Sequence, residues 1–479
     1  MADRKRKRED AYAYASPAAT SLAPPRRHLP PHQLVLAPMV GGSELAFRLL
    51  ARRHGATLCY SPMIRSEEFT AKRTERGIGQ LEVHPHDAPL VAHFSGNDAS
   101  VLLAAAKRAE QLPGVAAVDL NLGCPQRSAH SGHFGAFLCI EPSDRQRVLT
   151  MVATLAHELT VPVFAKIRLL DDGVDETIRF AQQLEAAGCA LLAVHGRYRG
   201  SPMHRRDGAA HLDQVRAIKQ RLSIPVLTNG NVRNAAELME TLASTGCDGV
   251  MSAEGALDDP AIFARACAAS KEERGRLKSE VKATAQLRQE ARAKGRELSD
   301  EEKRVVAQSK ESKVKLKALP KLRRLDLTTT TTTEAGEGAG GEGGSGEGAS
   351  GGGGSAGGGS GGGGSASADA SACYASAPLD LAEQYLDLVG SHPPPGECGD
   401  IKQEIVMAHT IFHLRRLCRT LLTDFNLLAE LKACTSLAAC AGVIKRCRAY
   451  AEGTMDFKGR RRPASYWKRQ QRRGKVIAE

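Results

Sequence analysis

The chain has 479 residues, which predicts two or three domains, and 42% of them are hydrophobic, enough for a sizeable core. Its net charge of +12 favours a polyanionic partner, and the competing interpretation, a membrane surface, lacks an amphipathic helix with an aromatic stripe. Neither a bilayer-spanning apolar run nor an apolar N-terminal signal segment occurs. Twelve cysteines without paired spacing or histidine partners indicate reduced thiols in an intracellular protein and argue against a metal site.

The chain begins with a polar segment, residues 1–32, that is expected to be disordered and basic. Its run Arg4-Lys5-Arg6-Lys7-Arg8 is equally consistent with a nuclear import signal and with a solvated chain end. The expected compartment is therefore the cytoplasm, the nucleus or both.

From residue 33 to residue 267, short apolar runs alternate with helical patterns. Eight such alternations over about 240 residues match a (β/α)8 TIM barrel. A doubly wound open sheet is the alternative, but no Gly-x-Gly-x-x-Gly follows an early strand. The eight expected strands are 34–37, 56–62, 89–96, 115–125, 161–168, 190–197, 224–231 and 247–255.

Residues 268–378 are expected to be a low-complexity linker. Lys271–Leu325 is dense in charge and is compatible with a solvated helix, and Glu334–Ser367 is mostly Gly, Ser, Ala and Glu, the composition of a flexible coil. Residues 379–452 show helical spacing and predict a small all-α domain rich in cations, for which a solvated bundle face is the plainer interpretation. The basic tail, residues 453–479, contains Tyr466 and Trp467, a mixture suited to RNA but equally typical of a disordered end.

The stretch Val115–Pro125 is an apolar run that ends abruptly in Asn, Gly, Cys and Pro. In a barrel of parallel strands this carboxyl end is where the active site lies. A thiol at Cys124 can therefore reach a bound ring, although free cysteines are more often small buried hydrophobes.

Other polar residues also fall at expected strand ends. Lys166 interrupts an apolar run and needs an anionic partner, either a ligand or a carboxylate of the barrel. His195 is followed by Gly196 and Arg197, which favours an open turn facing a ligand over a buried core histidine. The ends 229–231 and 253–255 suit backbone binding of a phosphate. Together these residues suggest a phosphorylated planar cofactor over the barrel mouth.

Seven motifs follow one another along the chain: Ala37–Arg48, Tyr60–Met63, Asp119–Gln126 with its Asn-Leu-Gly-Cys-Pro-Gln block, His133–Leu138, Lys166–Arg168, His195–Arg197 and Asn229–Asn231. In this order they resemble the tRNA-dihydrouridine synthase family, most of all its eukaryotic branch acting on uridines 16 and 17. The resemblance covers about residues 33–265, with a helical region near 380–450.

The resemblance implies a monomeric FMN-dependent reductase that consumes NADPH or NADH, acts on tRNA, and uses no metal and no membrane. Reduced flavin would pass hydride to C6 of a flipped-out uracil, and Cys124 would donate a proton to C5 from the opposite face. Asn121 and Arg168 would bind the substrate. The FMN-binding residues would be Pro38, Met39, Val40, His93, Lys166, His195, Asn229, Gly230, Asn231, Ala253 and Glu254.

Two positions depart from the family pattern. His93 stands where the family usually has Gln, and His130 lies near the position of a usual lysine. Two other functions stay open beside the reductase: a tRNA-binding barrel that has lost catalysis, and a flavin oxidoreductase acting on a free pyrimidine. The joint presence of Cys124 and Lys166 disfavours the first, and the basic helical region and tail disfavour the second.

Overall fold

A computed structural model describes residues 27–71, 81–201, 208–322, 366–392 and 400–457. The basic run near the N-terminus, the Gly-rich part of the linker and the basic stretch Lys458–Lys475 lie outside the described residues.

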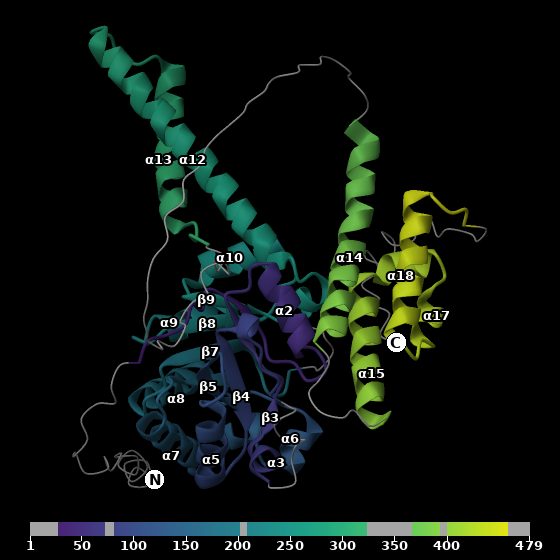
Figure 1. Ribbon diagram of the computed structural model, residues 1–479. Coiled ribbons are helices and arrows are strands. Elements are labelled where there is room, and N and C mark those ends of the chain that lie inside the picture. The colour runs from purple at the N-terminus through teal and green to yellow at the C-terminus, as the bar shows by residue number, and fades with distance from the viewer. Residues whose placement is uncertain (1–26, 72–80, 202–207, 323–365, 393–399, 458–479) are drawn as a thin grey trace, which may run out of the picture.

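The described part of residues 33–267 forms a closed barrel of parallel strands, as the sequence predicts (Figure 1). The sheet runs in the order β2-β1-β9-β8-β7-β6-β5-β4-β3, and pairing of β2 with β4 closes it, so that β3 only continues the β2 side. The bounds are β1 Leu34–Leu36, β2 Leu58–Tyr60, β3 Ile64–Arg65, β4 Leu90–Ser95, β5 Val115–Leu122, β6 Val163–Leu169, β7 Leu191–Tyr198, β8 Val226–Asn229 and β9 Gly249–Ser252.

Helices connect successive strands on the outside of the barrel. Several begin as the sequence suggests: Asp98 caps α5 and Asn234 caps α10 through side-chain oxygens. The bounds are α2 Leu45–Arg53, α3 Ser66–Thr70, η2 Pro85–Asp87, α5 Ala99–Ala109, α6 Arg127–Ser131, η3 Gly135–Cys139, α7 Pro142–Glu158, α8 Val174–Ala186, α9 Leu212–Lys219, α10 Ala235–Thr245 and α11 Glu254–Asp258.

The inside of the barrel is filled by an apolar core, to which each strand contributes alternate residues. Its members include Val91, Ala117, Phe164 and Ala193, all fully buried. Because strand side chains alternate between the two faces, the next inward positions toward the carboxyl ends are His93, Asp119 and their counterparts. This core therefore stops where polar side chains begin, and this change places the site at the mouth.

The charged part of the expected linker is helical. α12 Ile262–Ala293 and α13 Asp300–Ala318 pair as a hairpin that projects from the barrel (Figure 1). Ser299 and Glu302 form a capping box that starts α13. The sequence suggested at most one solvated helix, because a charge-rich pattern hides the buried positions at Leu277 and Ala291 along which α13 packs.

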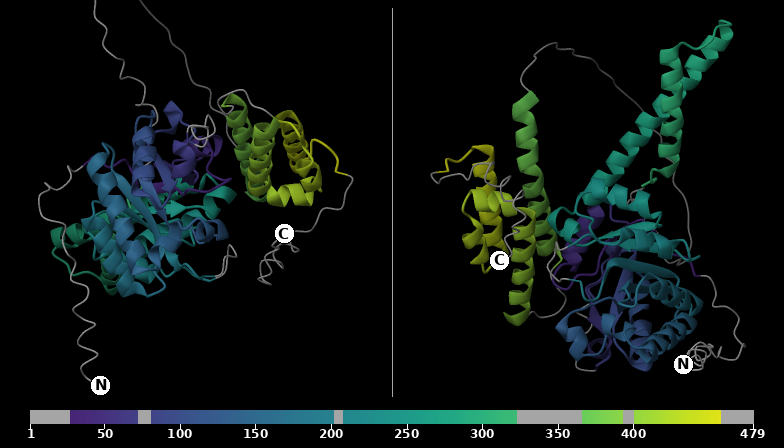
Figure 2. Two further views of the ribbon diagram at one scale, coloured as in Figure 1. Left: turned by 90° about the horizontal axis from the view of Figure 1, so that it is seen from below. Right: turned by 180° about the vertical axis from the view of Figure 1, so that it is seen from behind.

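A helical domain follows, as predicted. It comprises α14 Ala366–Ser391, α15 Asp400–Leu417, α16 Arg419–Asp424, α17 Leu428–Lys432 and α18 Leu437–Glu452, and Figure 2 shows it at the side of the barrel. The apolar spacing of residues 401–423 and 427–450 predicts one helix for each range, but the structure breaks each into two, at Cys418 and around Cys434. The domain shares one apolar core with the barrel, in which Phe47 of α2 meets Tyr385 of α14. Among the described residues no helix is long and apolar enough to cross a membrane.

Candidate active site

The polar residues at the mouth lie on neighbouring strands in register. His93 pairs with Asp119, Asn121 with Lys166, and Arg168 with His195, which in turn pairs with Asn229. Parallel strands set these side chains at the same end of the barrel. The structure thus brings together the strand-borne site residues that the sequence predicted from separate segments.

His93 is held by Asp119, which the sequence interpretation had quoted only as part of a motif. Nδ1 of His93 lies 2.6 Å from Oδ2 of Asp119, and both side chains are buried. Burial raises the pKa of Asp119 more than the hydrogen bond to His93 and the charge of Lys166 lower it. Because Nδ1 of His93 faces this carboxyl group, Nε2 is the ring nitrogen left for a ligand.

Two buried polar atoms beside this pair have no hydrogen-bond partner in the described part of the chain: the Tyr60 hydroxyl and Oδ1 of Asp119. Burial and the charge of Asp119 raise the pKa of Tyr60 well above its usual value, so the phenol stays protonated. Unsatisfied buried polar groups mark places where water or a ligand completes the structure. Tyr60 is a site residue to which the sequence analysis gave no role.

Lys166 is half-buried, and its ammonium group makes no hydrogen bond or ion pair to any residue that the structure describes. Burial and then the charge of Arg168 lower its pKa to about 8, against the opposing effects of Asp119 and Cys124. The sequence left a carboxylate partner open as an alternative, but within the described ranges none lies at hydrogen-bonding distance from the ammonium, and Asp119 turns toward His93. Lys166 thus has the position of a cation awaiting an anionic ligand.

Three further basic groups surround Lys166. Burial and the charge of Arg197 lower the pKa of Arg168 to about 10, and burial with the charges of Lys166, Arg168 and Arg197 lowers the pKa of His195 well below its usual value. His195 is therefore a neutral imidazole at physiological pH. The pKa values of these groups are lowered for the same reason, because several basic side chains lie close together in a half-buried mouth. A bound anion would offset this repulsion.

Cys124 is half-buried in a turn built by its neighbours. Oδ1 of Asn121 accepts the backbone N–H groups of Gly123 and Cys124 at 3.0 and 3.1 Å, and Nε of Arg168 donates to the Gly123 carbonyl at 2.8 Å. Gly135 has φ +67°, and a Cβ there would lie 2.9 Å from the Cys124 carbonyl oxygen. Asn121 and Arg168, predicted to bind substrate, are thus also the groups that hold the thiol in place.

The loops after β8 and β9 carry the residues assigned to a phosphate. Gly230 and Asn231 both have positive φ, +122° and +58°, and Asn231 Oδ1 accepts a hydrogen bond from Arg197 at 2.6 Å. Asn229 instead donates to the Met251 carbonyl at 2.9 Å, which ties β8 to β9. The sequence analysis assigned Asn229, Gly230 and Asn231 to the same role. In the structure Asn229 joins two strands, and only the turn at Gly230 and Asn231 faces Arg197.

Ala253 and Glu254 begin α11, and Glu254 is held from the helical domain. Arg416 of α15 donates to its carboxylate at 2.8 Å and to its backbone carbonyl at 2.9 Å, and also to Asp258 at 2.7 Å. The Arg416 side chain is only 9% exposed. Nothing in the sequence links Arg416 to the barrel mouth, so this contact could not be predicted.

The loop from Pro38 to Ser43 is fixed from both sides. Ser43 Oγ accepts from the Met39 N–H at 3.0 Å, whereas Val40 is 73% exposed and contributes no packing to the core. From the helical domain, His413 contacts Glu44 at 3.1 Å and His409 contacts it at 3.4 Å. Burial acts to raise the pKa of Glu44, but the two histidines hold it below its ordinary value.

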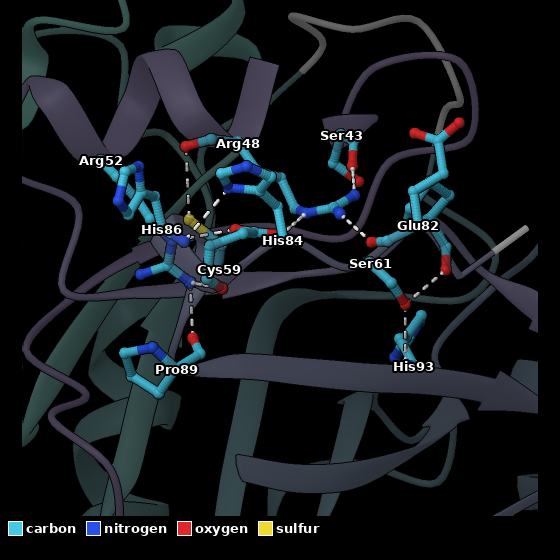
Figure 3. A network of polar contacts seen from close by, with 12 residues as sticks. Ser43, Arg48, Arg52, Cys59, Ser61, Glu82, His84, His86, Pro89 and His93 are labelled. Atoms are coloured by element: carbon cyan, nitrogen blue, oxygen red, sulfur yellow. Dashed lines mark hydrogen bonds and ion pairs between the residues drawn. The ribbon is translucent and has the colours of Figure 1, made fainter. Parts of the chain in front are cut away.

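A buried ion-pair network supports this side of the mouth (Figure 3). Arg48 and Arg52 of α2 share the carboxylate of Asp87 at 2.7 and 2.9 Å, and Arg48 also donates to the Ser43 carbonyl. Ser61 Oγ accepts from the backbone N–H of His93 at 3.0 Å. The β1–α2 loop and β4 are therefore held at fixed positions by α2 and its neighbours.

A pocket opens beside the mouth, between the segments that follow β5 and β6. It is lined in part by Arg168, Arg145, Arg199 and Asp171, but by none of His93, Lys166 and His195. His130 is exposed on α6, with its ring 4.9 Å from that of Phe137 near this pocket. The described residues contain no group of three His, Cys, Asp or Glu side chains that could hold a metal ion.

The fold and site define a (β/α)8 barrel with a thiol beside a cationic, ligand-binding mouth. The family model for dihydrouridine synthase (Dus) matches residues 35–337, more than half of the chain, and the chain belongs to this family.

The match with "tRNA-dihydrouridine(16/17) synthase [NAD(P)(+)]-like" of Mus musculus is 46% identical over 233 residues, 48% of this chain and 47% of that protein. The corresponding synthase of Schizosaccharomyces pombe is 41% identical over 48% of this chain and 56% of its own length. "tRNA-dihydrouridine(20a/20b) synthase [NAD(P)+]-like" of Homo sapiens is 38% identical over 48% and 70%. The chain thus spans about half the length of the (16/17) relatives.

Proposed function

We propose that this protein is an FMN-dependent tRNA-dihydrouridine synthase that uses NAD(P)H to reduce the C5=C6 bond of D-loop uridine 16, uridine 17 or both. The observation that carries the proposal is the juxtaposition of Lys166 and Cys124. Lys166 lacks a direct partner among the described residues, and it pairs across β5 and β6 with Asn121, whose Oδ1 accepts the backbone N–H of Cys124 at 3.1 Å. Lys166, a cation without a protein partner among the described residues, and the thiol of Cys124 therefore lie at the same barrel mouth.

The residues present suit FMN. The ammonium of Lys166 matches the N1–C2 edge of a flavin, which becomes anionic on reduction, and neutral His195 can accept or donate a hydrogen bond beside it. Arg197 and the turn at Gly230 and Asn231 suit a phosphate. Nε2 of His93, which stands in place of the Gln usual in the family, is free of Asp119 and can form one hydrogen bond to the polar edge of the flavin. When bound and reduced, FMN supplies the hydride for C6 of the uracil.

The other half of the reduction is assigned to Cys124, whose thiol holds the proton destined for C5. Asn121 and Arg168 fix its approach through the turn that they brace. A thiol is a competent acid near neutral pH as long as it is protonated. The choice of uridines 16 and 17 rests on the greater identity to the (16/17) synthases, 46% and 41%, than to the human (20a/20b) protein, 38%.

The test is the Cys124→Ala variant, assayed for dihydrouridine in tRNA, for bound flavin by its visible spectrum and for tRNA affinity. Turnover should be abolished while flavin and tRNA still bind. The matched control is Cys139→Ala, because Cys139 is a buried thiol of the same loop whose Sγ donates to the Leu122 carbonyl within the apolar core, and this variant should keep turnover. Undiminished turnover in Cys124→Ala refutes the proton assignment, and a wild-type protein that binds no flavin refutes the proposed function.

A further inference from the structure

The α12–α13 hairpin carries a strongly uneven distribution of charge. Residues 262–318 include sixteen Lys or Arg against nine Asp or Glu. Acidic residues at four of its positions are engaged within the hairpin: Glu273 and Glu280 with Arg276, Asp300 with Lys303, and Glu302 with Arg296. Arg276, Arg296 and Lys303 take part in these pairs, of which the one between Lys303 and Asp300 is exposed, and the excess of positive charge is carried mainly by the other lysines and arginines.

These cations follow the period of the hairpin's buried seam. In α12, Ser270, Leu277, Thr284 and Ala291 are buried at intervals of seven. Lys271, Lys278 and Arg292 each follow one of them directly, and all three are exposed. At about 100° per residue, such positions lie on one flank of the seam along the whole helix.

The second helix repeats the pattern. Lys303, Lys310 and Lys317 recur at intervals of seven in α13, and Lys310 directly follows the buried Ser309. Each row thus lies on the same-handed flank of its own helix's seam. Because α12 and α13 are antiparallel and face each other, same-handed flanks fall on the same side of the pair. We define this side, with the six residues named, as the basic face.

The opposite side has a different composition. Glu273, Glu280 and Arg276 form an ion-paired cluster there, and Ser312 of α13 donates to Glu280 at 2.7 Å. Lys315 lies near this cluster, since its charge lowers the pKa of Glu273. Hence the segregation of charge is a property of the folded hairpin and not only of composition.

We propose that the basic face binds the phosphate backbone of tRNA, at a part of the RNA remote from the uridine being reduced; this rests on the proposed function. Figure 1 shows the hairpin rising from the barrel away from α6 and α3, which follow β5 and β3 at the mouth. A helix of 32 residues is about 48 Å long, so Arg292 and Lys303, at the far end of the basic face, lie well away from the mouth. A row of cations spread along two helices matches the repeated phosphates of an extended polyanion, whereas a single nucleotide is too short to contact it.

The test compares two full-length variants with equal loss of charge: Lys310→Gln/Lys317→Gln on the basic face and Arg304→Gln/Lys315→Gln on the other flank of α13. Binding to a full-length tRNA transcript is measured over a range of salt concentrations. The basic-face variant should bind several-fold more weakly, with a slope of log K against log[salt] reduced by about 0.7–0.9 for each lost phosphate contact. The control variant should match the wild type.

A second probe, a short stem–loop containing only the D-arm, should bind equally to all three proteins, because the hairpin lies away from the mouth. Equal losses in both variants, no loss in either, or a loss that extends to the D-arm probe each overturn the proposal. If tRNA is bound and reduced with an unchanged salt slope in the basic-face variant, only this inference fails. If the wild type binds no tRNA, the proposed function fails with it.

Discussion

Replacing Lys166 by Met should make the protein without flavin more stable and make its flavin binding weaker. Burial and neighbouring cations lower the pKa of Lys166 from its ordinary 10.5 to about 8. At about 1.4 kcal/mol per pKa unit, the charged form costs on the order of 3 kcal/mol at neutral pH, which is an upper limit. Because the side chain is half-buried, solvent screening reduces this figure to roughly 1–2 kcal/mol.

The stability gain is measured by thermal unfolding of the flavin-free protein. Domains of about 150–250 residues shift by roughly 2–4 °C per kcal/mol, so Lys166→Met should melt a few degrees higher than the wild type. The gain should depend on pH. Native Lys166 loses its proton near pH 8 and the unfolded residue near 10.5, so the cost is full below pH 8 and disappears as the pH rises through this window.

The affinity loss is measured by titrating FMN and following its fluorescence. Removing the unpaired ammonium should weaken binding about tenfold or more, since a charge-assisted contact in a half-buried site contributes about 1.5–3 kcal/mol. The matched control is Lys107→Met, because Lys107 is an exposed lysine paired with Glu158 at 2.8 Å and should change neither property. A Lys166→Met protein that melts lower while binding FMN normally would refute the reasoning.

Further predictions concern the other parts of the mouth. Flavin binding to the wild type should weaken as the pH rises above about 8, while Lys166→Met shows no such step, which titrations at several pH values would reveal. Gly135→Ala should lower turnover but leave flavin binding unchanged. A Cβ at φ +67°, 2.9 Å from the Cys124 carbonyl oxygen, costs about 1–3 kcal/mol and displaces the thiol. An activity assay and the flavin spectrum measure the two effects separately. Arg416→Met should weaken FMN binding several-fold by releasing Glu254 and α11, with partial rescue by Arg416→Lys, and unaltered affinity in both variants would contradict it.

Most of the barrel could be predicted because its signals are local. Each strand is an apolar run closed by a turn, and the site residues on a strand are the polar side chains at its last inward positions, as for Lys166 and His195. The partner of His93 could also be predicted from the sequence, because Asp119 is the only acidic residue in the strands that the structure describes, and its side chain is fully buried. A buried acid there requires a partner on a neighbouring strand.

Contacts between distant parts of the chain were beyond such reasoning. Arg416 and Glu254 are 162 residues apart, and no periodicity relates them. The helical hairpin was obscured for another reason, because its buried seam uses serine, threonine and alanine, as at Ser270 and Thr284, within a charged sequence. A helix with such a weak apolar stripe is recognised only once its partner helix is seen.

The contacts of α15 imply that the barrel mouth is not a property of the barrel alone. Glu44 stands at the end of the β1–α2 loop and Glu254 starts α11, and both carboxylates are held by α15, through His413 and Arg416. Phe47 stacks on His413 at 4.3 Å, which ties this polar contact to the apolar core that the two domains share. Each loop is short and gains little stability from its own residues, so its position depends on the domain that grips it. The helical domain therefore acts on the proposed cofactor site through the contacts of His413 and Arg416 with these two loops.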